Sequence, residues 1–387
     1  MNLYRSRALA AIAVAFMLPL EAPAQGGNWR LSPYPAGHRF AFTIVHDADS
    51  AYSRRLAPLF EEFDALHMKL TVTSFVFWAD WARDGAIWSE WRAAARPRQP
   101  FFQPIAVPLV DPEERRFYLG LAARGYEIGM HSASETSDTT AQTVRAFATF
   151  TQIFGHPPAV YVEHSAANNK EALNNQGADP HSPYYILGVL RQYQPWVWID
   201  GPGGMPSDHE THFFDLAAIP SAPFCPELAQ RYGLERVFMR SGKFHTADGN
   251  AFLEWYTQGN IDQLVQNRGL ALVYTHLDKQ WLDPGTRKMR TPLHERLAYL
   301  VSNDGWFFPA GAILDRLVLM RKVSLQSDGK TVHIANRNAA AVDSISAIAP
   351  AGAVLCRGNR VYRPNASGAI VVGPLHAGET AEWRICR

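Results

Sequence analysis

The chain has 387 residues, of which 47% are apolar and 12% aromatic, and its formal net charge is +1 at pH 7. This composition is typical of a well-packed globular protein and excludes a largely disordered chain. The near-zero charge also argues against nucleic acid as a partner, because proteins that bind it carry an excess of lysine and arginine.

The N-terminal segment has the three parts of a secretory signal peptide in the expected order. Arg5 and Arg7 give it a basic start, residues 8–20 are apolar, and residues 22–24 read Ala, Pro, Ala, which is a small-residue cleavage site. We therefore expect residues 1–24 to be removed and the mature protein to be periplasmic or secreted. No later stretch is apolar over the roughly 18 residues that span a bilayer, so no membrane anchor is expected.

From residue 39 onward, short apolar runs alternate with stretches of helical spacing, a pattern that predicts a parallel sheet covered by helices. The expected strands are residues 40–46, 70–78, 126–131, 159–164, 196–200, 237–240, 271–276 and 306–309. The expected helices are residues 54–66, 113–124, 139–153, 184–193, 251–267 and 292–303. The predicted fold class is α/β, with an irregular (β/α) barrel over residues 25–320.

The last part of the chain has a different pattern. After Met320, short alternating segments are separated by glycine- and asparagine-rich turns, which predicts a small all-β sandwich over residues 321–387. Cys356 and Cys386 are expected to form a disulfide in an oxidising compartment, and closing a loop of about 30 residues stabilises a fold by about 3–4 kcal/mol. Cys225 would then be a free, buried cysteine.

Residues able to do chemistry follow most of the expected strands. In chain order they are Asp47, Asp49, His131, His164, Asp200, Arg240 and His276. The carboxyl ends of barrel strands open on one face, where active sites are built. Acids and histidines that converge there predict a metal site, because Zn²⁺ takes imidazole and carboxylate ligands and keeps an open position for water.

Three segments carry recognisable motifs: residues 42–49 end in two aspartates, residues 126–135 contain a histidine followed by serine, and residues 270–277 are an apolar run with a histidine near its end. Together these segments resemble the motifs of the polysaccharide deacetylase family, the NodB-homology group of carbohydrate esterases. The resemblance covers roughly residues 39–309. It implies the irregular (β/α) barrel of that family and a bound divalent metal ion, with Zn²⁺ the expected one.

The resemblance also implies roles for individual residues. Asp47 would be the general base and Asp49 a metal ligand, as in the family's first motif. His131 would be a second metal ligand, and His276 would be the general acid that protonates the leaving group.

The chain departs from the family motifs in three places. The first acids are separated by one residue, Glu135 stands where a second histidine ligand is expected, and residues 162–165 replace the arginine-containing segment that orients the base. The favoured hypothesis is a relocated ligand, in which His164 completes a triad with Asp49 and His131. Direct ligation by Glu135 and a barrel that no longer binds metal are the two alternatives.

Further residues are expected to lie around the substrate. Arg240, Asp200 and Trp78 are the expected substrate-binding residues, and the indole of Trp78 suits the apolar face of a sugar ring. Arg240 is also a candidate to replace the missing arginine that orients Asp47. Asp200 and Asp278 are the two candidates to keep His276 protonated.

The predicted function is metal-dependent removal of acetyl groups from an extracellular or cell-wall polysaccharide, with N-acetyl the expected type of group. One alternative is a catalytically inactive protein that binds glycans in the same barrel. A second is a glycoside hydrolase that uses paired carboxylates such as Asp47 and Asp200. Metal retention separates the first alternative from the hydrolase, and activity that survives chelation would indicate the second.

Overall fold

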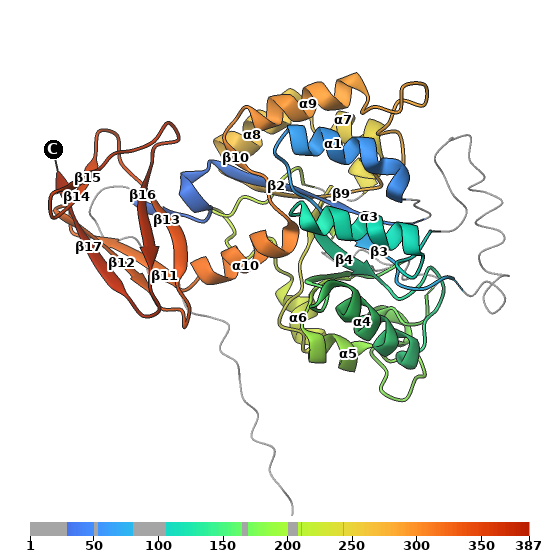
Figure 1. The fold of residues 1–387 in the computed structure, drawn as a ribbon. Coiled ribbons are helices and arrows are strands. Elements are labelled where there is room, and N and C mark those ends of the chain that lie inside the picture. Colours follow the sequence, from blue (N-terminus) through green and yellow to red (C-terminus); the bar gives the residue numbers. More distant parts are fainter. Residues whose placement is uncertain are drawn as a thin grey trace, which may run out of the picture.

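The computed structural model describes residues 29–49, 53–79, 106–164, 169–199, 208–209, 211–242 and 244–386. The expected signal segment and Asp200 lie outside these ranges. Figure 1 shows a body of helices around a sheet and an all-β unit at the C-terminal end of the chain. No helix in the described ranges is long and apolar enough to cross a membrane.

The body is built on a parallel sheet that curls toward a closed barrel. Its strands are β2 (Phe40–His46), β3 (Thr71–Ser74), β4 (Glu127–His131), β5 (Val160–Val162), β6 (Trp196–Trp198), β7 (Asp208–His209), β8 (Arg240–Ser241), β9 (Leu270–Thr275) and β10 (Gly305–Trp306). Their order is β6-β5-β4-β3-β2-β9-β8-β7, with β10 beside β2. Val197 of β6 also forms a parallel bridge to Val237, just before β8. This bridge joins the two sides of the sheet, so the predicted (β/α) barrel is confirmed.

The central strands show why the sequence forms a parallel sheet. Every residue of β2 and of β9 is buried, as expected when helices cover one face of a sheet and the barrel interior the other. The register pairs His46 at the end of β2 with Thr275 at the end of β9. The residues that follow, Asp47 and His276, therefore emerge side by side at the carboxyl edge.

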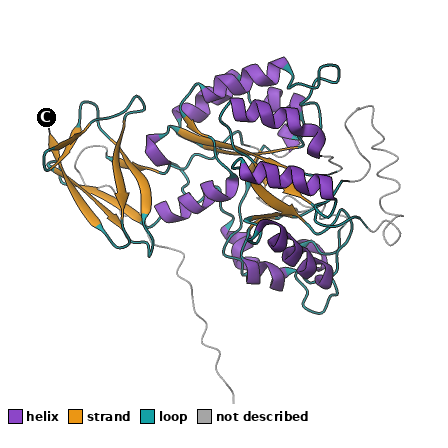
Figure 2. Cartoon of the chain, in the orientation of Figure 1, coloured by secondary structure: helices purple, strands orange, loops and turns teal. Residues whose placement is uncertain are grey.

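The helices lie around the barrel strands (Figures 1 and 2). They are α1 (Ala57–Ala65), α3 (Pro112–Ala123), α4 (Thr140–Phe154), α5 (Leu187–Tyr193), α6 (Pro226–Tyr232), α7 (Gly249–Trp255), α8 (Gln258–Gln266), α9 (Thr291–Val301) and α10 (Ala310–Met320). The single helix predicted over residues 251–267 is wrong, because the structure has two. The hydroxyl of Thr257 accepts a hydrogen bond from the backbone N–H of Asn260 and starts a new helix.

The C-terminal unit is a sandwich of two antiparallel sheets, which confirms the predicted all-β domain. One sheet has the order β11-β12-β17-β14-β15, and the other has the order β1-β13-β16. Their bounds are β1 (Arg30–Ser32), β11 (Val323–Ser327), β12 (Thr331–Asn336), β13 (Val342–Ile348), β14 (Val354–Arg357), β15 (Arg360–Tyr362), β16 (Ala369–Leu375) and β17 (Thr380–Cys386). Strand β1 was not predicted, and it joins the sandwich from the segment that precedes the barrel.

Helix α10 leads from the barrel to the sandwich (Figure 1). Its Arg316 is buried and donates hydrogen bonds to the backbone carbonyls of Asp343 and Ser344 in the sandwich. Charge-assisted hydrogen bonds of this kind are stronger than neutral ones. Arg316 therefore ties the sandwich to the last helix of the barrel.

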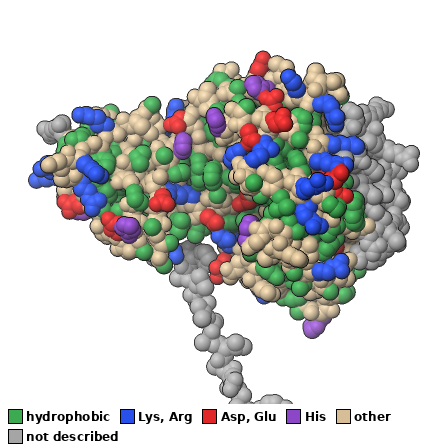
Figure 3. All heavy atoms as spheres, viewed as in Figure 1, with side chains coloured by type: hydrophobic (Ala, Val, Ile, Leu, Met, Phe, Trp, Pro, Cys, Tyr) green, Lys and Arg blue, Asp and Glu red, His purple; other side chains and the backbone are tan. Residues whose placement is uncertain are grey.

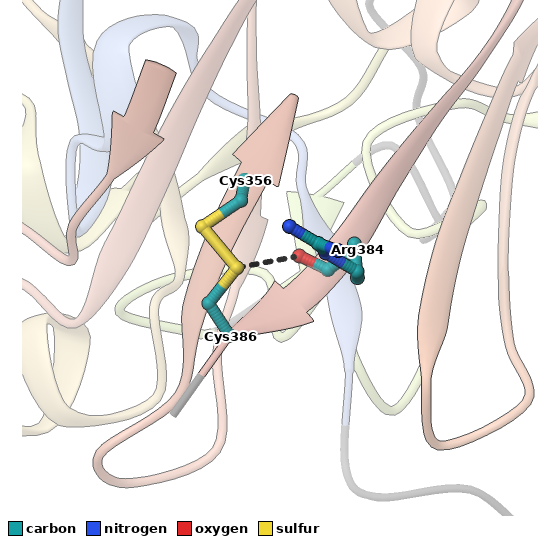
Figure 4. The surroundings of a disulfide bond; sticks show 3 residues. All are labelled: Cys356, Arg384 and Cys386. Atoms are coloured by element: carbon teal, nitrogen blue, oxygen red, sulfur yellow. Dashed lines mark hydrogen bonds between the residues drawn. A yellow bond between two sulfur atoms is a disulfide. The ribbon is translucent and has the colours of Figure 1, made fainter. Parts of the chain in front are cut away.

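The disulfide predicted between Cys356 and Cys386 is present and joins the neighbouring strands β14 and β17 (Figure 4). Cys225 is free and buried, also as predicted. On the face drawn in Figure 3, acidic and basic side chains are interspersed with apolar and uncharged ones. This distribution agrees with the net charge of +1.

Candidate metal centre

Three predicted ligands come together at the carboxyl edge of the sheet. Asp49 follows β2, His131 ends β4 and His164 follows β5, and their ligand atoms all lie within 4.8 Å of one another. Asp49 Oδ1 is 2.6 Å from His131 Nε2 and 3.3 Å from His164 Nε2. One carboxylate oxygen and two imidazole nitrogens form a donor set that suits a divalent transition metal with open positions for water and substrate.

A backbone carbonyl orients His131. Its Nδ1 lies 3.0 Å from the carbonyl oxygen of Val162. A carbonyl oxygen only accepts hydrogen bonds, so Nδ1 carries a hydrogen and Nε2 is directed at Asp49. The ring of Phe75 packs against both histidines, with its centroid 4.8 Å from that of His131 and 5.2 Å from that of His164. The metal centre thus has an apolar wall on one side.

The electrostatics of these side chains favour a proton between His131 and Asp49. Burial by itself lowers the pKa of His131, but the carboxylates of Asp47 and Asp49 outweigh it and raise this pKa to about 9. Burial raises the pKa of Asp49, but His164 and His131 overcome that effect and hold it well below its usual value. The site therefore favours positive charge beside the Asp49 carboxylate, where a metal ion would take the place of the proton.

Glu135 lies apart from this group of ligands. Its Oε2 accepts a hydrogen bond of 2.8 Å from the backbone N–H of Ala106. Glu135 does not belong to the group whose ligand atoms converge, whereas His164 does. Among the described residues, the geometry thus favours the relocated ligand over direct ligation by Glu135.

Asp47, the expected general base, is buried beside the ligands and pairs with an arginine. Its Oδ1 lies 3.9 Å from His131 Nε2 and 3.4 Å from Arg240 Nη1. Arg240 is completely buried, and its guanidinium lies 3.3 Å from the ring centroid of Trp198 and 4.3 Å from that of Tyr274. Contact with Asp47 fits the orienting role considered for Arg240.

His276, the expected general acid, is held at both ring nitrogens. Its Nδ1 lies 3.3 Å from the backbone oxygen of Asp47, and its Nε2 lies 2.6 Å from the hydroxyl of Tyr274. Because the carbonyl can only accept, Nδ1 carries the hydrogen and Nε2 accepts a hydrogen bond from Tyr274. Burial lowers the pKa of His276 well below its usual value, which favours this neutral form.

Trp78, the expected sugar-stacking residue, is 52% exposed, so its indole is accessible to a ligand. The backbone N–H groups of the preceding residues Val76 and Phe77 both donate to the carbonyl of Ala133, two residues after His131. These bonds place the segment that carries Trp78 beside the loop that follows β4.

Sequence analysis missed several residues of the site. Tyr274 could have been found, since it precedes His276 by two residues, the spacing that brings strand side chains to one face. Asn169 contacts His164 Nδ1, and Glu171 contacts Asn169. Neither residue directly follows a predicted strand or matches a motif, so no signal in the sequence marks them. Asp200 lies outside the described ranges, so its expected role stays a prediction.

No family model matches the chain, and no curated protein matches it. Among solved structures, the chain is similar to Puue allantoinase, with 11% identity and a TM-score of 0.39 over 74% of this chain and 93% of that one. It is also similar to the peptidoglycan deacetylase PdaC from Bacillus subtilis, with 11% identity and a TM-score of 0.31 over 75% of this chain and 94% of that one. Similarities this low assign no activity to the chain.

Proposed function

We propose that this chain, whose motifs resemble those of the polysaccharide deacetylase family, is a metal-dependent hydrolase that removes acetyl groups, chiefly N-acetyl, from an extracellular or cell-wall polysaccharide. The observation that carries the proposal is the convergence of Asp49, His131 and His164 beside the buried Asp47. A carboxylate next to such a donor set is placed to act as a base on a water held there.

Asp47 is the proposed general base. A bound divalent ion would lower the pKa of a water and polarise the acetyl carbonyl. Asp47 would take the proton of that water as its oxygen attacks the carbonyl carbon. Arg240, whose Nη1 lies 3.4 Å from Asp47 Oδ1, fixes the direction of this carboxylate.

The pair of His276 and Tyr274 is proposed to supply the proton for the leaving group. The carbon–nitrogen bond of the acetamide breaks as the departing nitrogen gains this proton, while Asp47 holds the proton taken from water. The products are acetate and a free amine. In the structure the Tyr274 hydroxyl donates to His276 Nε2. Tyr274 would give this hydroxyl proton to the departing nitrogen, and it would regain a proton from solvent as Asp47 releases the one taken from water.

A polysaccharide substrate and an extracellular location complete the proposal. The exposed indole of Trp78 is suited to stack on a sugar ring near the metal centre. The signal-like N-terminal sequence and the disulfide between Cys356 and Cys386 support an oxidising compartment outside the cytoplasm.

The test is a measurement of metal content and of acetate release on the purified mature chain, prepared without chelator. The substrates are N-acetylglucosamine oligomers and an O-acetylated glycan. We expect about one equivalent of a divalent ion, acetate release, and loss of both in His131→Ala. The control is His156→Ala, which removes an exposed histidine outside the site and should change neither.

Each alternative gives a different result. A wild-type chain that binds glycan but binds no metal and releases no acetate would indicate the inactive glycan-binding protein. Cleavage of the glycan that survives chelation would indicate a glycoside hydrolase. Either result would overturn the proposed deacetylation.

A further inference from the structure

The two histidines of the metal centre are held in different ways. His131 donates from Nδ1 to the carbonyl of Val162, so its Nε2 can present a lone pair once its extra proton leaves. His164 Nδ1 instead lies 3.1 Å from Nδ2 of Asn169. An amide nitrogen carries hydrogens and accepts nothing, so Nδ1 of His164 must accept and its hydrogen must sit on Nε2.

This tautomer of His164 suits the metal-free protein but not the loaded one. With hydrogen on Nε2, His164 can donate to Asp49 Oδ1, 3.3 Å away. The same hydrogen leaves Nε2 without a lone pair for a metal ion. Ligation therefore requires the hydrogen to move to Nδ1, where it needs an acceptor.

Asn169 itself can provide that acceptor. The residue is completely buried, and its Oδ1 has no hydrogen-bond partner among the residues that the structure describes. A buried amide oxygen without a partner is costly, commonly by about 1–3 kcal/mol. A half-turn of the amide would bring Oδ1 to the Nδ1 hydrogen of His164 and give this oxygen its partner.

Glu171 determines which orientation of the amide is stable. In the structure Asn169 Nδ2 also donates to Glu171 Oε1 at 3.1 Å, while Glu171 Oε2 accepts from the backbone N–H of Asp138. After the half-turn, Asn169 Oδ1 would face Glu171 Oε1, and the contact is favourable only if Glu171 carries a proton.

We propose that Asn169 is the positioning residue of the metal centre: its side-chain amide sets the tautomer of His164, and metal loading requires it to present Oδ1 in place of Nδ2. Glu171 Oε1, which accepts from Asn169 Nδ2, favours the orientation of the amide seen in the structure. The inference rests on the proposed metal-dependent function, since it concerns how the same three ligands become ready for the ion.

The first test changes Asn169 and Glu171 and measures the affinity for Zn²⁺ by competition with a chromophoric chelator. Asn169→Leu removes the acceptor and should weaken binding by about 10- to 100-fold. Glu171→Gln should bind at least as tightly as wild type, because its amide oxygen can accept from Asp138 while its amide nitrogen donates to the turned Asn169 Oδ1. Asn267→Leu is the matched control on an exposed asparagine at the end of α8, outside the site, and it should leave the affinity unchanged.

These outcomes separate a positioning role from a merely structural one. If Asn169 only held the loop together, Glu171→Gln would break the same hydrogen bond and weaken Zn²⁺ binding as Asn169→Leu does, which would overturn the inference. Wild-type affinity in Asn169→Leu would overturn it as well. A wild-type chain that binds no Zn²⁺ would refute the proposed function itself, so the two failures are distinguishable.

A second measurement needs no variant. Nitrogen-15 NMR of histidine side chains in the metal-free wild-type protein reports which ring nitrogen carries hydrogen. We expect His164 with hydrogen on Nε2 before Zn²⁺ is added and on Nδ1 afterwards. Hydrogen on Nδ1 already in the metal-free protein would contradict the proposed role of Asn169.

Discussion

Replacing Arg240 by methionine removes the positive charge that faces Asp47 inside the barrel. Both side chains are buried, and Arg240 Nη1 lies 3.4 Å from Asp47 Oδ1. Methionine keeps most of the packing between Trp198 and Tyr274 but leaves the carboxylate beside an apolar group. We expect Arg240→Met to destabilise the metal-free protein and to lower its activity when metal is bound.

The structure sets the size of the effect. At 3.4 Å and an effective dielectric constant of about 20, two unit charges attract each other by about 5 kcal/mol. Removing one partner of a buried pair costs about 3–5 kcal/mol in measured cases, because the other charge stays buried and unpaired. We expect Arg240→Met to lower the free energy of unfolding by about 3–5 kcal/mol. The double variant Arg240→Met/Asp47→Asn should lose much less than the sum of the losses in the two single variants.

The assay is urea unfolding of metal-free protein at pH 7, followed by tryptophan fluorescence, in a double-mutant cycle of Arg240 and Asp47. The control is Arg236→Met, which breaks the partly exposed pair of Arg236 with Asp315 and should cost under about 1 kcal/mol. A coupling energy below about 0.5 kcal/mol between Arg240 and Asp47 would refute the reasoning, since independent residues add within that margin.

Three further predictions concern protons. Zn²⁺ affinity should rise about tenfold per pH unit up to about pH 9, the pKa of His131, because metal and proton compete for its Nε2; equal affinity in chelator competition at pH 6 and pH 8 would contradict this. Tyr274→Phe should slow acetamide hydrolysis about 100-fold, within the usual range for acid catalysis, yet spare 4-nitrophenyl acetate, whose leaving group needs no proton; equal losses on both substrates would argue against proton transfer. Burial raises the pKa of Glu114 from 4.5 to about 7, so the free energy of unfolding falls by on the order of 3 kcal/mol as the pH rises between these values. Glu114→Gln should therefore raise the melting temperature at pH 8 but not at pH 4.5, and a gain of the same size at both pH values would contradict the assignment.

The accuracy of the strand predictions depends on how much of each strand is buried. The prediction for residues 40–46 coincides with β2, and that for residues 271–276 is within one residue of β9. Both strands are buried along their whole length, so apolar side chains mark them from end to end. The prediction for residues 70–78 is too long, because only Thr71–Ser74 pair and the chain continues as an irregular segment beside the metal centre.

Elements that depend on distant partners could not be predicted. Strand β1 has three residues and is defined by its pairing with β13, more than 300 positions away. Helix α10 was not predicted, although its apolar residues are buried between barrel and sandwich, because an apolar helix at a domain junction lacks the polar face of a surface helix. Such elements are specified by what they pack against.

The same division applies to the candidate site. Strand ends can be read from the sequence, and on that basis Asp49, His131 and His164 were selected and are found together. Tyr274 and Asn169 were not selected, because their importance lies in the atoms that they contact. The contact of the Tyr274 hydroxyl with His276, and that of the Asn169 amide with His164, produce no periodic pattern in the sequence.

By itself the sequence determined the alternation of strands and helices, the all-β end with its disulfide, and the identity of the polar residues that follow each strand. A strand or helix that buries one face needs apolar residues at a regular spacing, and this spacing can be read from consecutive residues. Only the tertiary structure decided that His164 and not Glu135 joins Asp49 and His131, and that Arg240 faces Asp47 across a separation of 193 positions. The order of strands in the sheet places β8 beside β9 and β5 beside β4, and no local pattern encodes that order.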